Sequence, residues 1–243
     1  MQSPAATRKP SGFSLVELAI VLTVVALLAG GLFAAIAAQR QAADDVDARR
    51  QLEGIREALL GYAMANGRLP CPAPAGLPTG DTAAGRAGDP PCDDARQHGV
   101  LPWATLGLSE TDPWGNRFSY FASAKFTGAL GAGALSSFTL ASGSPEATPA
   151  DNAGTANVKE TRSSGANIAA DLPAVVISHG RNGAGAWQPA GVRHPAVAGD
   201  EAENADDDLT FVARTPGEGF DDVLTWVAPS ILKAKMVAAG RLP

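Results

Sequence analysis

Cysteine and histidine are scarce in this chain of 243 residues, which has two cysteines and three histidines. Two thiols without a second pair or a close histidine fall short of the four ligands of a structural zinc site. The sequence also lacks Gly-x-Ser-x-Gly, His-Glu-x-x-His and phosphate-loop patterns. His98, His179 and His194 are scattered, and Ser178 beside His179 cannot form a catalytic triad by itself. We therefore expect no catalytic residues, and a protein that is not an enzyme.

Basic residues are fewer than acidic ones. The chain has 19 lysines and arginines and 25 aspartates and glutamates, so the net charge is −6. An acidic chain without a basic patch is a poor candidate for general nucleic-acid binding. No nucleic-acid partner is therefore expected. The length leaves room for one sizeable soluble domain beside a membrane helix.

One long apolar run is present near the N-terminus, at residues 13–38, and it contains a single charge, Glu17. The run is longer than the roughly 20 residues that a helix needs to cross a bilayer. Residues 1–12 before it are polar and basic and have no apolar core of their own, unlike a secretory signal. The sequence therefore predicts a membrane-spanning helix with its basic leader in the cytoplasm and the C-terminal part outside.

Glu17 is the unusual feature of this run. An ionised glutamate in hydrocarbon costs at least about 2.5 to 3.5 kcal/mol, so it needs a positive partner. Cleavage after Gly12 would supply one, the free α-amine of Phe13. The alternative is an ordinary signal anchor that carries a stray glutamate.

The basic leader ending in Gly12, then Phe13, then Glu17 at the fifth position after it, then a long apolar stretch, resembles the type IV prepilin and pseudopilin family. The resemblance implies that a membrane prepilin peptidase cuts between Gly12 and Phe13 and N-methylates Phe13. It also implies that Glu17 pairs with the Phe13 amine of a neighbouring subunit in a helical filament. The implied partners are the prepilin peptidase, other pilin or pseudopilin subunits and the inner membrane.

The helix is expected to continue beyond the apolar run, because apolar residues recur at spacings of three and four and Asn66-Gly67 supplies a stop. The resemblance implies an α+β fold of pilin type, in which this long N-terminal helix packs on an antiparallel β-sheet head. The predicted parts are a leader at 1–12, a transmembrane helix at 13–38, an amphipathic helix continuation at 39–67 and an extracytoplasmic globular head at 68–243.

Alternating apolar residues and turn signals predict the elements of the head. Strands are expected at 117–121, 137–141, 172–178, 209–214 and 220–227, and a helix at 230–239. Asp112 to Gly115 fits a type I turn, and Asp112 to Asn116 also resembles the equivalent stretch of the major pseudopilins of type II secretion. Residues 142–170 form a low-complexity tract, which predicts an exposed loop.

Cys71 and Cys92 frame a segment rich in Gly, Pro and Asp that shows no periodicity. The head is expected in the periplasm or on an extracellular filament, where a disulfide is permitted. We therefore expect Cys71 and Cys92 to be bonded. Closing a loop of this length stabilises the fold by roughly 3 kcal/mol on the chain-entropy model.

Calcium is the one cofactor that the resemblance suggests, because major pseudopilins bind it through carboxylates and carbonyls of a C-terminal loop. The comparable region here is acidic, and its candidate ligands are Asp206, Asp208, Asp221 and Asp222. Oxygen ligands suit calcium, but the spacing matches no calcium loop and an acidic run is usually solvated. The sequence therefore assigns no cofactor.

The expected function is that of a structural subunit, a minor pilin or pseudopilin of a type IV pilus or type II secretion filament. It would be a single-pass inner-membrane protein before assembly. The alternative is a membrane-anchored extracytoplasmic binding module that is not assembled into filaments. An anchored envelope hydrolase is a third hypothesis. The combination of Gly12, Phe13 and Glu17 favours the filament subunit over both.

Overall fold

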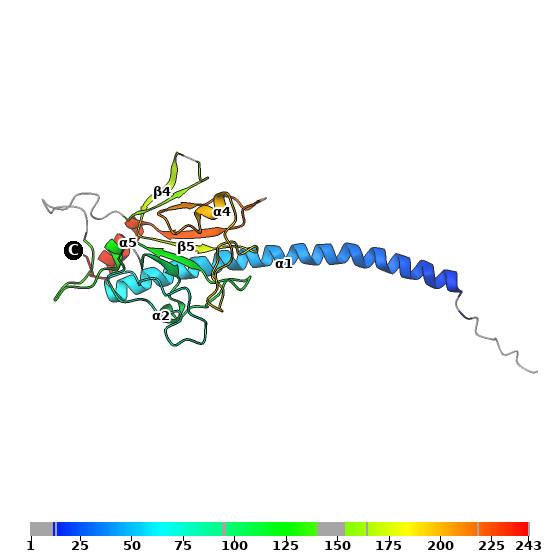
Figure 1. Ribbon diagram of the computed structural model, residues 1–243, viewed down its shortest axis with the longest axis horizontal. Coiled ribbons are helices and arrows are strands. Elements are labelled where there is room, and N and C mark those ends of the chain that lie inside the picture. The colour runs from blue at the N-terminus through cyan, green and yellow to red at the C-terminus, as the bar shows by residue number, and fades with distance from the viewer. Residues whose placement is uncertain are drawn as a thin grey trace, which may run out of the picture. The chain divides into compact units, whose positions relative to one another are not determined.

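The computed structural model describes residues 12, 14–93, 96–139, 154–163, 165–217 and 219–242, without the side chains of residues 29–38. Figure 1 shows its helices and strands. The chain divides into two compact units, residues 1–43 and residues 44–243, which are described separately below.

The first unit contains the start of helix α1, which runs from Leu15 to Asn66 and ends in the second unit. The helix predicted from residue 13 to residue 66 is thus confirmed over residues 15–66. Across the residues that the structure describes, no helix is sufficiently long and apolar to cross a membrane. The transmembrane segment expected at 13–38 is not confirmed and stays a prediction.

In the second unit, α1 carries the predicted amphipathic pattern. Its buried stripe consists of Ala48, Leu52, Ile55, Leu59, Leu60 and Ala63. Apart from the adjacent Leu59 and Leu60, these residues recur every three or four positions, so they lie on one face of the helix. Gly67 ends the helix with a φ of +71°, and its N–H donates to the carbonyl of Ala63 at 2.8 Å. The predicted stop at Asn66-Gly67 is confirmed.

The larger sheet has four strands, all antiparallel, in the order β1-β2-β5-β7. They are β1 (His98–Val100), β2 (Ser119–Ala122), β5 (Ala174–Ser178) and β7 (Val223–Val227). One face of this sheet packs on the buried stripe of α1 and on helix α5 (Pro229–Ala238), as Figure 1 shows for the cyan end of α1. The α+β class, a helix on an antiparallel sheet, is confirmed.

The smaller sheet covers the other face of the larger one and has the order β4-β3-β6. Its strands are β4 (Asn167–Leu172), β3 (Ala156–Lys159) and β6 (Thr210–Val212). β3 pairs with β4 antiparallel and with β6 parallel, so the head is not purely antiparallel. All five residues of β5 are buried, because both faces of this strand are covered.

Three further helices are single turns in the head. They are α2 (Trp103–Leu106), α3 (Ala124–Thr127) and α4 (Asp200–Glu203). α4 forms the start of the acidic segment at 200–208.

The predicted strands at 117–121, 172–178, 209–214 and 220–227 are present as β2, β5, β6 and β7, each shorter than predicted, although β2 extends one residue past the predicted end. One predicted strand and one predicted loop differ from the structure. Ser137 to Thr139 is not a strand, and the rest of the stretch predicted at 137–141 lies outside the described residues. The tract at 142–170 includes β3, whose Ala156 and Val158 are fully buried in the core between the sheets. The tract also includes the start of β4, so low complexity did not mean an exposed loop here.

Candidate functional site

The residues predicted to direct processing and assembly lie at the start of α1. Gly12 is exposed, and Phe13 lies outside the described residues. The hydroxyl of Ser14 accepts a hydrogen bond from the N–H of Val16 at 3.3 Å, so the helix begins directly after the predicted cleavage point. Glu17 is exposed in the first turn of α1, where unpaired backbone N–H groups favour a negative charge.

The side chains around Glu17 form an apolar surface on the first unit. Leu15 is 86% exposed and Ile20 is 60% exposed. A shallow groove of about 440 Å³ runs between them, and its one polar side chain, Thr23, bonds to the carbonyl of Ala19 at 2.8 Å. A contiguous exposed apolar surface of this kind marks contact with another protein or with lipid.

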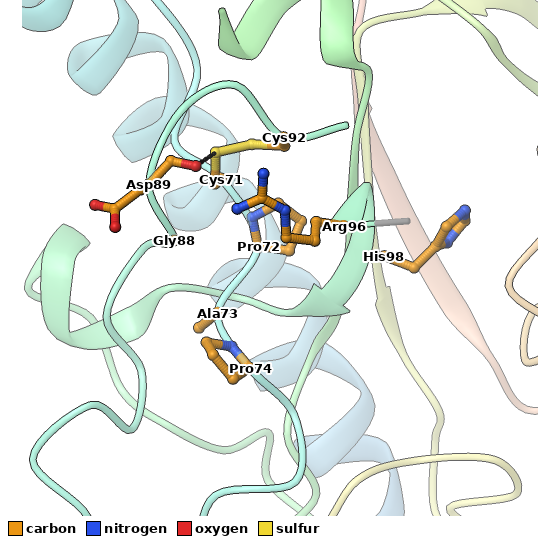
Figure 2. Close-up of a pocket in the computed structure, with 9 residues that line it drawn as sticks. All are labelled: Cys71, Pro72, Ala73, Pro74, Gly88, Asp89, Cys92, Arg96 and His98. Atoms are coloured by element: carbon orange, nitrogen blue, oxygen red, sulfur yellow. Dashed lines mark hydrogen bonds between the residues drawn. A yellow bond between two sulfur atoms is a disulfide. The ribbon is translucent and has the colours of Figure 1, made fainter. Parts of the chain in front are cut away.

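A disulfide joins Cys71 and Cys92, as the sequence predicted, with the Cα atoms 5.7 Å apart. Figure 2 shows the pocket beside it, a cavity of about 370 Å³ with Pro72 and Pro74 in its wall. Arg96 also lines it, but its guanidinium is engaged by the carboxylate of Asp93 and a backbone carbonyl. The described wall is therefore mostly apolar, with a disulfide in place of reactive thiols.

The four calcium candidates do not lie together, because the structure divides them between two carboxylate clusters. The inner cluster is Glu201, Asp221 and Asp222, and the outer cluster is Glu203, Asp206 and Asp208. Within each cluster the candidate ligand oxygens lie within 4.8 Å of one another. Neither glutamate is among the four candidate ligands. Residues two positions apart on a helix point to different sides, so α4 contributes Glu201 to one cluster and Glu203 to the other.

The outer cluster has the character of a solvated turn. Glu203 pairs with Arg162 at 2.8 Å. The exposed carboxylates of Asp206 and Asp208 each accept a hydrogen bond from a backbone N–H two residues ahead, at 3.2 and 2.6 Å. Burial and the neighbouring Asp208 raise the pKa of Asp206. These contacts are those expected of an acidic run at the surface.

The inner cluster is more buried, and side-chain amides already bind its carboxylates. Both oxygens of Glu201 accept from Nδ2 of Asn182 at 3.0 Å, and Oε1 also accepts from the N–H of Asp221 at 2.9 Å. Oδ2 of Asp222 accepts from Nδ2 of Asn204 at 2.7 Å. Burial raises the pKa of Glu201 and raises that of Asp222 strongly. The oxygens that a cation would need are thus largely occupied, and the cluster does not fit calcium.

A third polar arrangement was missed by sequence reasoning. Ser119 on β2 lies 2.7 Å from Nε2 of His179, and Nδ1 of the same ring lies 3.8 Å from Oδ1 of Asp222. His179 is fully buried, and burial lowers its pKa to about 4. The cavity beside Ser119 measures only about 10 Å³, room for one water molecule. The order of groups is that of a catalytic triad, but a substrate has no space at the hydroxyl.

No spacing in the sequence could have revealed this arrangement, because Ser119 and His179 are 60 residues apart and meet only through the pairing of β2 with β5.

Comparison with known proteins bears on the N-terminal segment. Residues 7–33 match the prokaryotic N-terminal methylation motif, which is the signature of type IV pilins and pseudopilins. The resemblance predicted from Gly12, Phe13 and Glu17 is therefore confirmed over this segment. Proteins that carry this motif are structural rather than enzymatic. Neither the comparison with curated proteins nor that with solved structures gave a match.

Proposed function

We propose that the chain is a minor pilin or pseudopilin, a structural subunit of a type IV pilus or type II secretion filament. The methylation motif at residues 7–33 is the observation that carries this proposal. The motif implies processing by a prepilin peptidase and assembly with other pilin subunits. The fold of the second unit, in which the end of α1 packs on a β-sheet, is consistent with such a subunit.

Before assembly, the apolar run at 13–38 anchors the chain in the inner membrane by a single pass. The exposed apolar side chains at the start of α1 support this step, because burying them in lipid removes them from water. The head lies in the periplasm or on an extracellular filament. The disulfide between Cys71 and Cys92 supports that location, since such bonds persist in oxidising compartments.

During assembly, the subunit leaves the lipid and enters a bundle of similar helices. Glu17 meets the α-amine of Phe13 from a neighbouring subunit, and opposite charges attract strongly in a medium of low dielectric constant. Each group also removes the cost of leaving the other unpaired. The exposure of Glu17 at the first turn of α1 supports this contact, because its carboxylate is accessible to a second chain.

Processing tests the proposal most directly. Mass spectrometry of the mature protein, from cells that contain a prepilin peptidase, should find a chain that begins with N-methylated Phe13. Gly12→Ala should slow the cleavage, whereas Gly30→Ala, the same change inside the apolar run, should leave its rate unchanged. A mature protein that still begins at Met1, or one cut after Ala38, would rule out the proposed function.

A further inference from the structure

The inner cluster, Glu201, Asp221 and Asp222, lies in the region where the resemblance to major pseudopilins implies a calcium ion. We infer that in this chain the side-chain amides of Asn182 and Asn204 bind these carboxylates in place of a divalent cation. The folding of the head is then independent of calcium. The inference concerns the head alone and stands whether or not the chain enters a filament.

Asn182 occupies the position that a cation would take on Glu201. Its Nδ2 lies 3.0 Å from both carboxylate oxygens, midway between them. A calcium ion bound by both oxygens would lie on the same side, at about 2.3 to 2.6 Å. The orientation of the amide is fixed, because its Oδ1 accepts from the N–H of Ala184 at 2.7 Å and the NH₂ group must then face Glu201.

The side-chain amide of Asn204 binds the carboxylate of Asp222 in a similar way. Its Oδ1 accepts from the N–H of Val212 on β6 at 2.8 Å. Its Nδ2 donates to the carbonyl of Val212 at 3.0 Å and to Oδ2 of Asp222 at 2.7 Å. Two contacts to the strand backbone hold this amide in place, so its N–H group points at the carboxylate and its oxygen cannot turn toward a metal ion.

The remaining oxygens of the cluster are few. Oδ2 of Asp221 accepts from the backbone N–H of Asn182 at 3.0 Å. Oδ1 of Asp222 is buried without a hydrogen-bond partner, as is Nδ1 of His179 at 3.8 Å from it. When Ser119 donates to Nε2, the ring proton lies on Nδ1 and faces Asp222. The distance of 3.8 Å between this nitrogen and Oδ1 of Asp222 is too long for a hydrogen bond.

Calcium takes six to eight oxygen ligands in proteins. In the inner cluster only Oδ1 of Asp221 and Oδ1 of Asp222 are buried carboxylate oxygens without a hydrogen bond among the described residues. An ion chelated by both oxygens of Glu201 would displace the amide of Asn182 from its hydrogen bonds to that carboxylate. The asparagines therefore do two things at once, since they donate hydrogen bonds to the carboxylates and connect α4 to the turn after β5 and to β6.

The experiment compares thermal unfolding of the full mature protein in detergent, with EDTA and with CaCl₂. All four tryptophans lie between residues 103 and 226, so tryptophan fluorescence reports on the head. We expect the Tm of the wild type to be the same in both conditions. Asn182→Asp removes the donor and adds a carboxylate, so its Tm should be lower in EDTA. It should rise by roughly 5 to 10 °C at a calcium concentration about 100-fold above the Kd.

Asn167→Asp is the matched control, because it makes the same change on an exposed position of β4 and should create no calcium dependence. If Asn182→Asp does not fold in either condition, Asn204→Asp tests the same point at the second amide. A wild-type Tm that rises with calcium would overturn the inference. So would a folded aspartate variant whose Tm is the same with calcium and with EDTA.

Discussion

Nη2 of Arg117 lies 2.7 Å from Oε1 of Glu110, in an ion pair whose arginine side chain is completely buried. The same guanidinium donates to the carbonyls of Ala75 and Leu77 at 3.0 and 2.7 Å. Arg117 thereby holds the segment framed by the disulfide against the larger sheet. That segment has no apolar periodicity, so a buried cation with several acceptors takes the role that side-chain packing has elsewhere.

Arg117→Met should strongly destabilise the head. It removes the charge partner of Glu110 and leaves backbone carbonyls without donors, so we expect a loss of about 3 to 5 kcal/mol in the free energy of unfolding. Denaturant unfolding followed by tryptophan fluorescence measures it. Arg50→Met is the control, because Arg50 and Asp47 form an exposed pair and such pairs contribute at most about 1 kcal/mol. Equal effects of the two substitutions would mean that the buried pair has no special role.

His179 should make the stability of the head depend on pH. Burial lowers its pKa to about 4, below the value of about 6.5 in an unfolded chain. Between these values the unfolded chain binds more protons, so stability falls as the pH falls from 6.5 toward 4. The loss from this group is on the order of 3 kcal/mol.

Buried carboxylates act in the opposite direction, because burial raises the pKa of Asp112 and Glu201. The test is therefore a difference between two proteins, the wild type and His179→Gln, unfolded by denaturant at several pH values. The variant should lose less stability than the wild type between pH 6.5 and pH 4. The same pH dependence in both proteins would show that His179 does not cause it.

Local patterns predicted the parts of the fold whose signal lies within a few residues. The buried stripe of α1 follows from helical spacing, and Gly67 ends the helix because glycine tolerates a positive φ. β3 shows the opposite case. Its sequence, Ala-Asn-Val-Lys, has weak strand propensity, and it becomes the central strand of the smaller sheet by pairing with β4 and with β6, the latter about 50 residues later in the chain.

The candidate sites show the same difference between local sequence signals and contacts that only the fold creates. Gly12 and Glu17 belong to a contiguous motif, so sequence alone located them. Asp221 and Asp222 were also identified, but the amide of Asn182 that faces the same cluster comes from a different turn, 39 residues away from Asp221. Whether a carboxylate cluster binds an ion or an amide depends on such neighbours, which tertiary structure alone brings together.

Reducing the disulfide should weaken the head by roughly 3 kcal/mol on the chain-entropy model, because the 21-residue separation of Cys71 and Cys92 leaves a long loop open. The measurement is the denaturant midpoint of the wild type with and without dithiothreitol. A variant with both Cys71→Ser and Cys92→Ser should match the reduced wild type and should not respond to dithiothreitol. A wild-type midpoint that is unaffected by complete reduction would contradict the expected contribution.

Glu17 provides the sharpest test of assembly. A carboxylate in an apolar environment is tolerated only when a positive group meets it, and after cleavage the nearest such group in the sequence is the α-amine of Phe13. Glu17→Ala makes the start of α1 more hydrophobic, so membrane insertion and cleavage should continue. Entry into filaments should fall by about tenfold or more, because the amine of each neighbouring subunit then lacks its counter-ion. Glu17→Val should behave in the same way, since charge and not size is the cause.

The measurement is the recovery of each variant in sheared filaments, or its cross-linking to other subunits, beside the wild type. Glu53→Ala is the matched control, because it removes an exposed carboxylate of the same helix that pairs with Arg56 on its own chain. It should be incorporated normally. Cleaved Glu17→Ala protein that enters filaments as well as the wild type would show that Glu17 is not the counter-ion of Phe13. The apolar run would then act as a plain membrane anchor.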